Sequence, residues 1–148
     1  MSGGAGAAAA LYKLTAQQKA AVAELKVTDQ RVRQHEQAHL AAAGPYAKGG
    51  PSYSYSIGPD GNMYATGGEV QLDVAPDPSD PQKTIEKART VEAAANAPAE
   101  PSSQDRRVAA QAAGIEQAAQ RQLDEQKQSS AYGEPDPVPV GQLISEIL

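Results

Sequence analysis

Two histidines four positions apart, His35 and His39, carry the clearest chemistry in this chain, and Glu36 directly follows the first of them. Residues i and i+4 lie one above the other on an α-helix, so two imidazoles at this spacing can converge on one metal ion. Glu36 points about a quarter-turn away, where its carboxylate can take a proton from a metal-bound water. The pattern matches the H-E-x-x-H motif of zinc hydrolases, and it predicts Zn²⁺ bound by both histidines with Glu36 as general base.

The position of the motif on its helix strengthens the zinc interpretation. Val32, Leu40 and Ala43 have the spacing of an inward apolar stripe, and the two histidines and the glutamate fill the middle of that stripe. Polar groups on a buried face cost free energy unless they have partners, and a metal ion supplies one. Chance is a poor explanation, because two randomly placed histidines show this spacing and the following Glu in about one arrangement in a thousand.

A catalytic zinc needs a third protein ligand and an open position for water. The chain has no third His and no Cys, so this ligand must be Asp or Glu. Glu69 is the predicted ligand, because two glycines before it allow the backbone to approach closely. Asp73 shares its strand face and is the rival ligand, or a hydrogen-bond partner of a ligand histidine. Both residues also fit the simpler interpretation of exposed carboxylates without a metal. A site of two histidines and one carboxylate can also hold Fe(II) instead of zinc.

Tyrosines are candidates for a hydroxyl that stabilises the developing oxyanion of a peptidase. Tyr53, Tyr55 and Tyr64 lie close together in the sequence, and Tyr46 comes shortly before them. The chain has no Phe and no Trp, so each tyrosine also fits a packing role in the core or the hairpin. Each tyrosine therefore fits either an oxyanion-stabilising role or a packing role.

The elements that must position these residues predict an α+β fold. A weakly amphipathic helix is expected over residues 15–25. The site helix is expected over residues 28–44, with Thr28 or Asp29 as its cap and a Gly-Pro pair as its stop. The motif therefore lies in the middle of a helix with defined ends.

After the site helix, alternating segments and turn residues predict a small β-hairpin sheet. Residues 51–57 alternate as a strand does, Gly58-Pro59-Asp60-Gly61 predicts a turn, and residues 63–66 form the returning strand. The two glycines that follow allow a bend or bulge before another alternating strand over residues 69–74. We expect the site helix to pack on this sheet.

Two further helices and disordered ends complete the predicted organisation. Asp80-Pro81 begins one helix that ends near Asn96, and a capping-box spacing from Ser102 to Asp105 begins the next. Large apolar residues are scarce, so a modest core is expected over part of the chain. The predicted regions are a disordered Gly/Ala-rich N-terminus (1–14), a metallohydrolase domain (15–125) and a disordered Pro-containing tail (126–148).

Composition excludes several classes of function. A net charge of −5 argues against a nucleic-acid partner, which would normally require a basic face. No apolar run is long enough to span a membrane, and the absence of Cys excludes disulfides and thiolate metal sites. The first ten residues lack the basic and apolar regions of a signal peptide, which favours a cytoplasmic location. The oligomeric state cannot be read from the sequence.

Several separated motifs resemble the SprA-related family, a bacterial family described as zinc metalloproteases with an HExxH motif. The resemblance covers about residues 28–125. It implies two histidine ligands, Glu36 as general base and a Gly-Gly-Glu motif ending at Glu69, but no particular substrate. Thr66 and Pro45 depart from the family pattern without affecting the site. The matching motifs are His35–Gly44, Pro51-Ser52-Tyr53, Gly58–Gly61 with Tyr64-Ala65, Gly67–Val70, and Ser103–Arg106 with Val108-Ala109.

These features together predict a zinc-dependent hydrolase, specifically a metalloprotease that acts on a peptide or protein substrate. Zn²⁺ held by His35, His39 and Glu69 would activate water, and Glu36 would pass the proton to the leaving amine. The alternative is a non-catalytic helical interaction module, metal-stapled or metal-free, because so small a core would gain stability from a metal. Glu36 favours the enzyme, since a structural site needs no base beside its first ligand.

Overall fold

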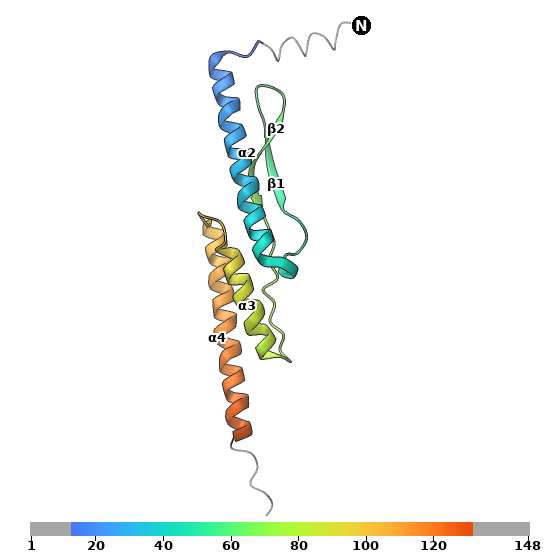
Figure 1. Ribbon diagram of the computed structural model, residues 1–148, viewed down its shortest axis with the longest axis vertical. Helices are drawn as coiled ribbons and strands as arrows, with labels where there is room; N and C mark the ends of the chain where they lie inside the picture. The colour runs from blue at the N-terminus through green and yellow to red at the C-terminus, as the bar shows by residue number, and fades with distance from the viewer. Residues whose placement is uncertain (1–12, 132–148) are drawn as a thin grey trace, which may run out of the picture.

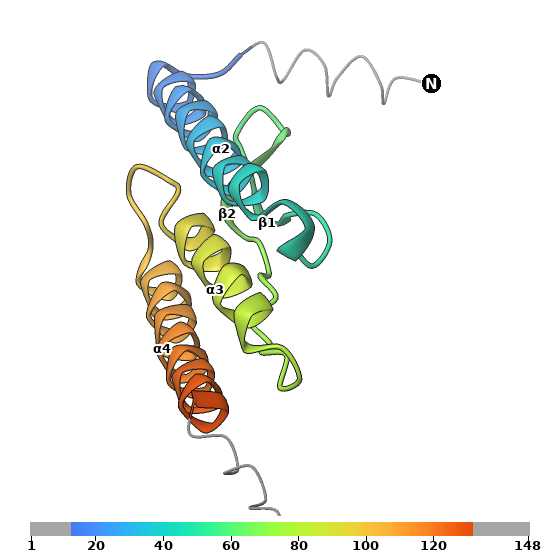
Figure 2. The ribbon, with the colours of Figure 1, turned by 60° about the horizontal axis from the view of Figure 1, so that its bottom comes forward.

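The computed structural model describes residues 13–131 and has an α+β fold, as predicted (Figure 1). Three long helices and one two-stranded antiparallel sheet make up these residues. The hairpin lies against the first helix, and the other two helices lie side by side in antiparallel directions (Figure 1, Figure 2). The elements are α2 (Ala16–Ala43), η1 (Gly44–Tyr46), β1 (Ser52–Ile57), β2 (Met63–Glu69), α3 (Pro81–Ala95) and α4 (Ser103–Ala131).

Helix α2 is continuous, so the predicted helix start at Thr28 or Asp29 is wrong. No Gly or Pro interrupts the chain between residues 16 and 43. The N-terminal cap of α2 lies at the start of the first of the two predicted helices. There Thr15 accepts a hydrogen bond from the Gln18 N–H at 3.1 Å, and the Gln18 side chain accepts one from the Thr15 N–H at 2.9 Å. The predicted stop is confirmed, because α2 ends before Gly44, whose φ of 54° is a conformation that favours glycine.

The hairpin forms where the sequence predicts it, but the returning strand does not end at Thr66, because Gly67, Gly68 and Glu69 also pair with β1. Gly58 donates its N–H to the Asn62 carbonyl at 2.8 Å and so closes the turn. The register shifts between Ser54 and Tyr55, which leaves Thr66 as the extra residue of a bulge, just before the two glycines that predict one. Beside the bulge, the Ala65 N–H donates to Asp29 on α2 at 2.8 Å. This bond ties the hairpin to the site helix.

The predicted strand over residues 69–74 is not formed. β2 ends at Glu69, and beyond it only Leu72 pairs, in an isolated bridge with Ala47. Hydrogen bonds from the Lys48 N–H to the Gln71 carbonyl and from the Asp73 N–H to the Tyr46 carbonyl, both 2.8 Å, flank this bridge. The segment that follows η1 offers only a short stretch of backbone for pairing, so the ladder stays too short for a strand.

Helices α3 and α4 start as predicted. Asp80 caps α3 by accepting the Lys83 N–H at 3.0 Å, and Ser102 with Asp105 forms the capping box of α4. The predicted disordered tail over residues 126–148 begins too early, because α4 continues to Ala131. Residues 1–12 of the predicted N-terminal end (1–14) and residues 132–148 of the predicted tail lie outside the described residues. The largest fully buried side chains are Ile85 and Val91.

The core is small and rich in alanine, as the composition predicts. Ala43, Ala65, Ala94 and Ala112 are each fully buried, so the helices pack on short side chains and bury little apolar area each. Within residues 13–131, no helix has the length and apolarity needed to cross a membrane.

Candidate metal centre

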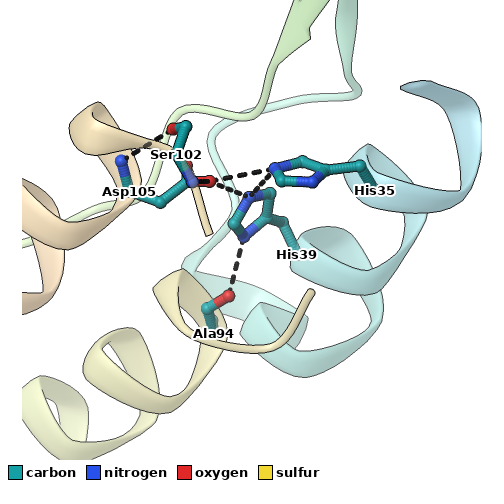
Figure 3. Close-up of polar contacts among 5 residues, drawn as sticks. All are labelled: His35, His39, Ala94, Ser102 and Asp105. Atoms are coloured by element: carbon teal, nitrogen blue, oxygen red, sulfur yellow. Dashed lines mark hydrogen bonds and ion pairs between the residues drawn. The ribbon is translucent and has the colours of Figure 1, made fainter. Parts of the chain in front are cut away.

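The predicted inward stripe of α2 is buried at Glu36, His39 and Ala43 and half-buried at its other positions. Glu36 is 4% exposed and His39 is 3% exposed, while the side chain of His35 keeps 24% of its surface. The stripe meets the last turn of α3 and the first turn of α4 (Figure 3). The motif therefore lies at the place where three helices come together.

His39 is held in one orientation by α3. Its Nδ1 lies 2.8 Å from the carbonyl oxygen of Ala94, and because a carbonyl can only accept, Nδ1–H is the donor. In the neutral imidazole the lone pair is then on Nε2, which points away from α3 toward His35 and Asp105 (Figure 3). A backbone carbonyl on the far nitrogen is the usual way in which proteins orient a metal-binding histidine.

Asp105 completes a triangle of donor atoms with the two histidines. Its Oδ2 lies 2.9 Å from His35 Nε2 and 3.1 Å from His39 Nε2. The two Nε2 atoms lie 3.1 Å apart. Ligands on tetrahedral zinc, with bonds of about 2.0–2.1 Å, are separated by about 3.3 Å. The three atoms already have nearly this spacing, so the group has the composition and geometry to hold a metal ion.

The N-terminus of α4 fixes the Asp105 carboxylate. The Ser102 N–H donates to Asp105 Oδ2 at 2.8 Å, and the Asp105 N–H donates to the Ser102 hydroxyl at 3.1 Å. Burial raises the pKa of Asp105, but hydrogen bonds from Ser102 and His35 outweigh it, and the pKa lies below the ordinary aspartate value. The carboxylate is therefore kept ionised, as a cation ligand must be.

The sequence interpretation gives Asp105 only a capping role and does not place it beside the two histidines. It lies seventy positions after His35, and no local pattern indicates that the start of α4 reaches α2. One signal was present, since Asp105 belongs to the Ser103–Arg106 motif that resembles the family. A carboxylate in a family motif can cap a helix and bind a metal at the same time.

Glu36 is buried without a hydrogen-bond partner for Oε2 among the described residues. Burial is the main cause that raises the pKa of Glu36, and positive charge on His35 or His39 opposes it. An ionisable group in such surroundings is costly to the folded state, which is typical of a catalytic position.

Gly68 provides the room for the Glu36 side chain. A Cβ added at Gly68 would lie 2.9 Å from Glu36 Cγ, 3.1 Å from Glu36 Oε1 and 3.0 Å from Tyr53 Cδ1. The backbone of β2 therefore approaches the site as closely as the two-glycine pattern predicts. At Gly67 a Cβ would meet only Ser54 Cβ at 3.8 Å, an ordinary contact.

We therefore expect Gly68→Ala to displace Glu36 and to lower the free energy of unfolding by about 1–3 kcal/mol, as overpacking does. Gly67→Ala is the matched control, and we expect it to change stability by no more than about 0.5 kcal/mol. Urea unfolding of both variants measures the difference. Equal effects at the two positions would show that the close approach at Gly68 is unimportant.

The two carboxylates predicted as alternative third ligands occupy different places. Glu69 is exposed and lines the same cavity of about 80 Å³ as the three donors and Glu36. Asp73 binds Lys87, with Oδ2 2.7 Å from Nζ, and this bond lowers the pKa of Asp73. Asp73 is not among the residues that line this cavity.

None of the tyrosines named as oxyanion candidates lines the cavity. Tyr53 and Glu36 both lie close to Gly68, and the guanidinium of Arg33 lies 5.1 Å from the Tyr53 ring centre. Tyr55 is 47% exposed on the hairpin. The hydroxyl of buried Tyr64 donates to Asp60, which raises the pKa of Tyr64. The ring of Tyr46 lies 5.7 Å from Lys87 Nζ.

Comparison with known proteins supports the resemblance seen in the motifs. The model of a family described as the SprA-related family matches residues 7–137, which is most of the chain. The match contains all the residues of the metal group and of the cavity around it. No curated protein and no solved structure matches the chain.

Proposed function

The chain belongs to the SprA-related family, and we propose that it is a zinc-dependent metalloprotease whose ion is bound by His35, His39 and Asp105. The observation that carries the proposal is the convergence of three oriented donor atoms beside a buried carboxylate, Glu36, that has no structural partner in the described residues. Two histidines and a carboxylate suit zinc, with room left for water. The same set can bind Fe(II), and the Glu inside the helical motif favours zinc.

Each residue of the group has a defined task in this proposal. His35, His39 and Asp105 would hold the zinc ion, which would supply a Lewis acid that makes water easier to deprotonate. Glu36 takes the proton from the attacking water and passes it to the leaving amine. Its raised pKa keeps the protonated form accessible for the second transfer. The Ala94 carbonyl and Ser102 keep His39 and Asp105 in orientation.

Glu69 is a second carboxylate of the proposed site. It is exposed and lines the same cavity, and we propose that it exchanges with water at the fourth position of the ion while no substrate is bound. Glu69 thus keeps the ligand role that the sequence predicts for it, while Asp105 is the third ligand. A ligand that can move away leaves the open position that catalysis requires.

A non-catalytic, metal-stapled module is the second candidate. It is favoured by one observation, since Asp105 ties the start of α4 to α2 in a protein with a small core. A metal bound there would stabilise the fold regardless of chemistry. Glu36 separates the two candidates, because a staple gains nothing from a buried carboxylate without a partner.

A peptide-library digestion tests the proposal. Untagged protein loaded with zinc is incubated with mixed peptides, and the products are read by mass spectrometry. We expect cleavage that stops when a chelator removes the metal and returns when zinc is added back. Zinc-loaded, folded protein that produces no cleavage would favour the stapled module.

A further inference from the structure

The cavity that holds the metal group is too small for a peptide residue. Its volume of about 80 Å³ is well below the cavity of about 150 Å³ that accepts a benzene molecule. A substrate must therefore place only its reacting group there and bind mainly outside. The more exposed ligand, His35, marks where the outside begins, since its side chain is 24% exposed and that of His39 is 3% exposed.

A second hollow lies on the other side of His35 and has the size of a ligand site. Its volume is about 570 Å³, within the range of about 300–1,000 Å³ for small-molecule pockets. One face of α2 and the loop between α3 and α4 form its walls, and the views show this loop beside α2 (Figure 1, Figure 2). Its lining residues are Arg31, Gln34, His35, Ala38 and Ala97–Glu100.

Arg31 is the only Lys or Arg that lines either hollow among the described residues. It lies one helical turn before His35 on the same face of α2. Arg31 takes part in none of the ion pairs formed within residues 13–131, so those pairs leave its guanidinium available to bind a ligand. By contrast, the nearby Arg33 is occupied by Asp29 at 3.1 Å.

We propose that this second hollow binds the substrate beside the scissile bond, and that Arg31 recognises a carboxylate there. The inference rests on the proposed function, to which it adds a substrate class. A guanidinium binds a carboxylate through two parallel hydrogen bonds, which gives both orientation and selectivity. That carboxylate comes from an acidic side chain or from the C-terminus of the peptide. Glu100, on the opposite wall, disfavours a second negative charge and so limits the site to one carboxylate.

Binding to zinc-loaded Glu36→Gln protein tests this without requiring turnover. One arm compares capped octapeptides that carry Asp with the same peptides carrying Asn. The other arm compares a free C-terminal carboxylate with a C-terminal amide in peptides without acidic side chains. Titration calorimetry of each pair is repeated with Arg31→Gln and with Arg107→Gln, an exposed arginine of α4 outside both hollows.

We expect the carboxylate form to bind about tenfold more tightly in one of the arms. Arg31→Gln removes this preference, Arg107→Gln keeps it, and adding Glu100→Gln to the Glu36→Gln protein increases it. The arm that shows the preference identifies the source of the carboxylate. Equal affinity for both forms in both arms, or equal effects of the two arginine substitutions, would overturn the inference. Cleavage of a peptide library by the wild type is measured separately, so loss of the carboxylate preference does not count against the hydrolase.

Discussion

Glu36→Gln is expected to lower peptide hydrolysis by about 10²–10⁴-fold, the range for loss of a general acid–base, while the protein still binds one zinc ion. The amide keeps the size of the side chain but cannot take a proton from water. The ligand atoms belong to His35, His39 and Asp105, and the substitution changes none of them. Metal content and the rate of cleavage, measured on the same preparation, check both parts of the expectation.

The same variant should be more stable than the wild type in the metal-free state at neutral pH. Because burial raises the pKa of Glu36, the folded state binds its proton more tightly than the unfolded state does. The contribution of Glu36 to stability is therefore fully present below the ordinary pKa of 4.5 and is lost as pH rises through the higher folded-state value. Gln does not titrate, so the gain in stability of Glu36→Gln over the wild type should appear above this pH range and vanish below it.

Thermal unfolding of metal-free wild type and Glu36→Gln between pH 4 and 8 measures this difference. A variant that loses its metal together with its activity would mean that Glu36 helps to bind the ion. A variant that loses stability at every pH would mean that the carboxylate has a structural partner, and the catalytic assignment would lose its basis.

Asp105→Ala is expected to weaken zinc binding by more than about 100-fold. Substitution of residues that only orient a metal ligand costs about 10–100-fold in affinity, and removing a ligand costs more. Competition titration with a chromophoric chelator measures the change. Asp105→Asn is the control for the helix cap. Its amide oxygen can still accept the Ser102 N–H, so the cap is kept, but the side chain carries no charge.

Glu69→Ala is the matched test of the other carboxylate. Glu69 is exposed and lines the cavity without belonging to the group of three donors, so we expect a smaller loss of affinity than for Asp105→Ala. The reverse order, with Glu69→Ala more damaging, would place Glu69 in the third-ligand position and reduce Asp105 to a helix cap that contacts the histidines.

Local patterns predicted the parts of the site that lie within one element. The spacing of His35, Glu36 and His39 predicts their shared inward face, and in the structure Glu36 and His39 are buried and His35 is half-buried. The two glycines before Glu69 predict a close backbone approach, which occurs at Gly68. Such features depend on helical periodicity and on the absence of a Cβ in glycine, and both can be read from consecutive residues.

The parts that were not predicted depend on contacts between distant segments. Asp105 meets the histidines only because α3 and α4 fold back so that the start of α4 reaches α2. The strand expected over residues 69–74 is missing because pairing needs a partner of sufficient length, and only Ala47 supplies a bridge. Asp29 looked like a helix cap, but Arg33 and the Ala65 N–H from β2 occupy its carboxylate. Tertiary partners decide such cases.

Metal content per chain shows whether His35, His39 and Asp105 hold a zinc ion. Wild type, His35→Ala and Gln34→Ala, all purified without a tag or chelator, are compared by elemental mass spectrometry after adding zinc and removing the excess. We predict one zinc ion per chain in the wild type and in Gln34→Ala, a neighbouring change that leaves the ligands intact, and none in His35→Ala. A folded wild type that takes up no zinc, or a His35→Ala variant that binds as much zinc as the wild type, would show that the two histidines do not form a zinc site.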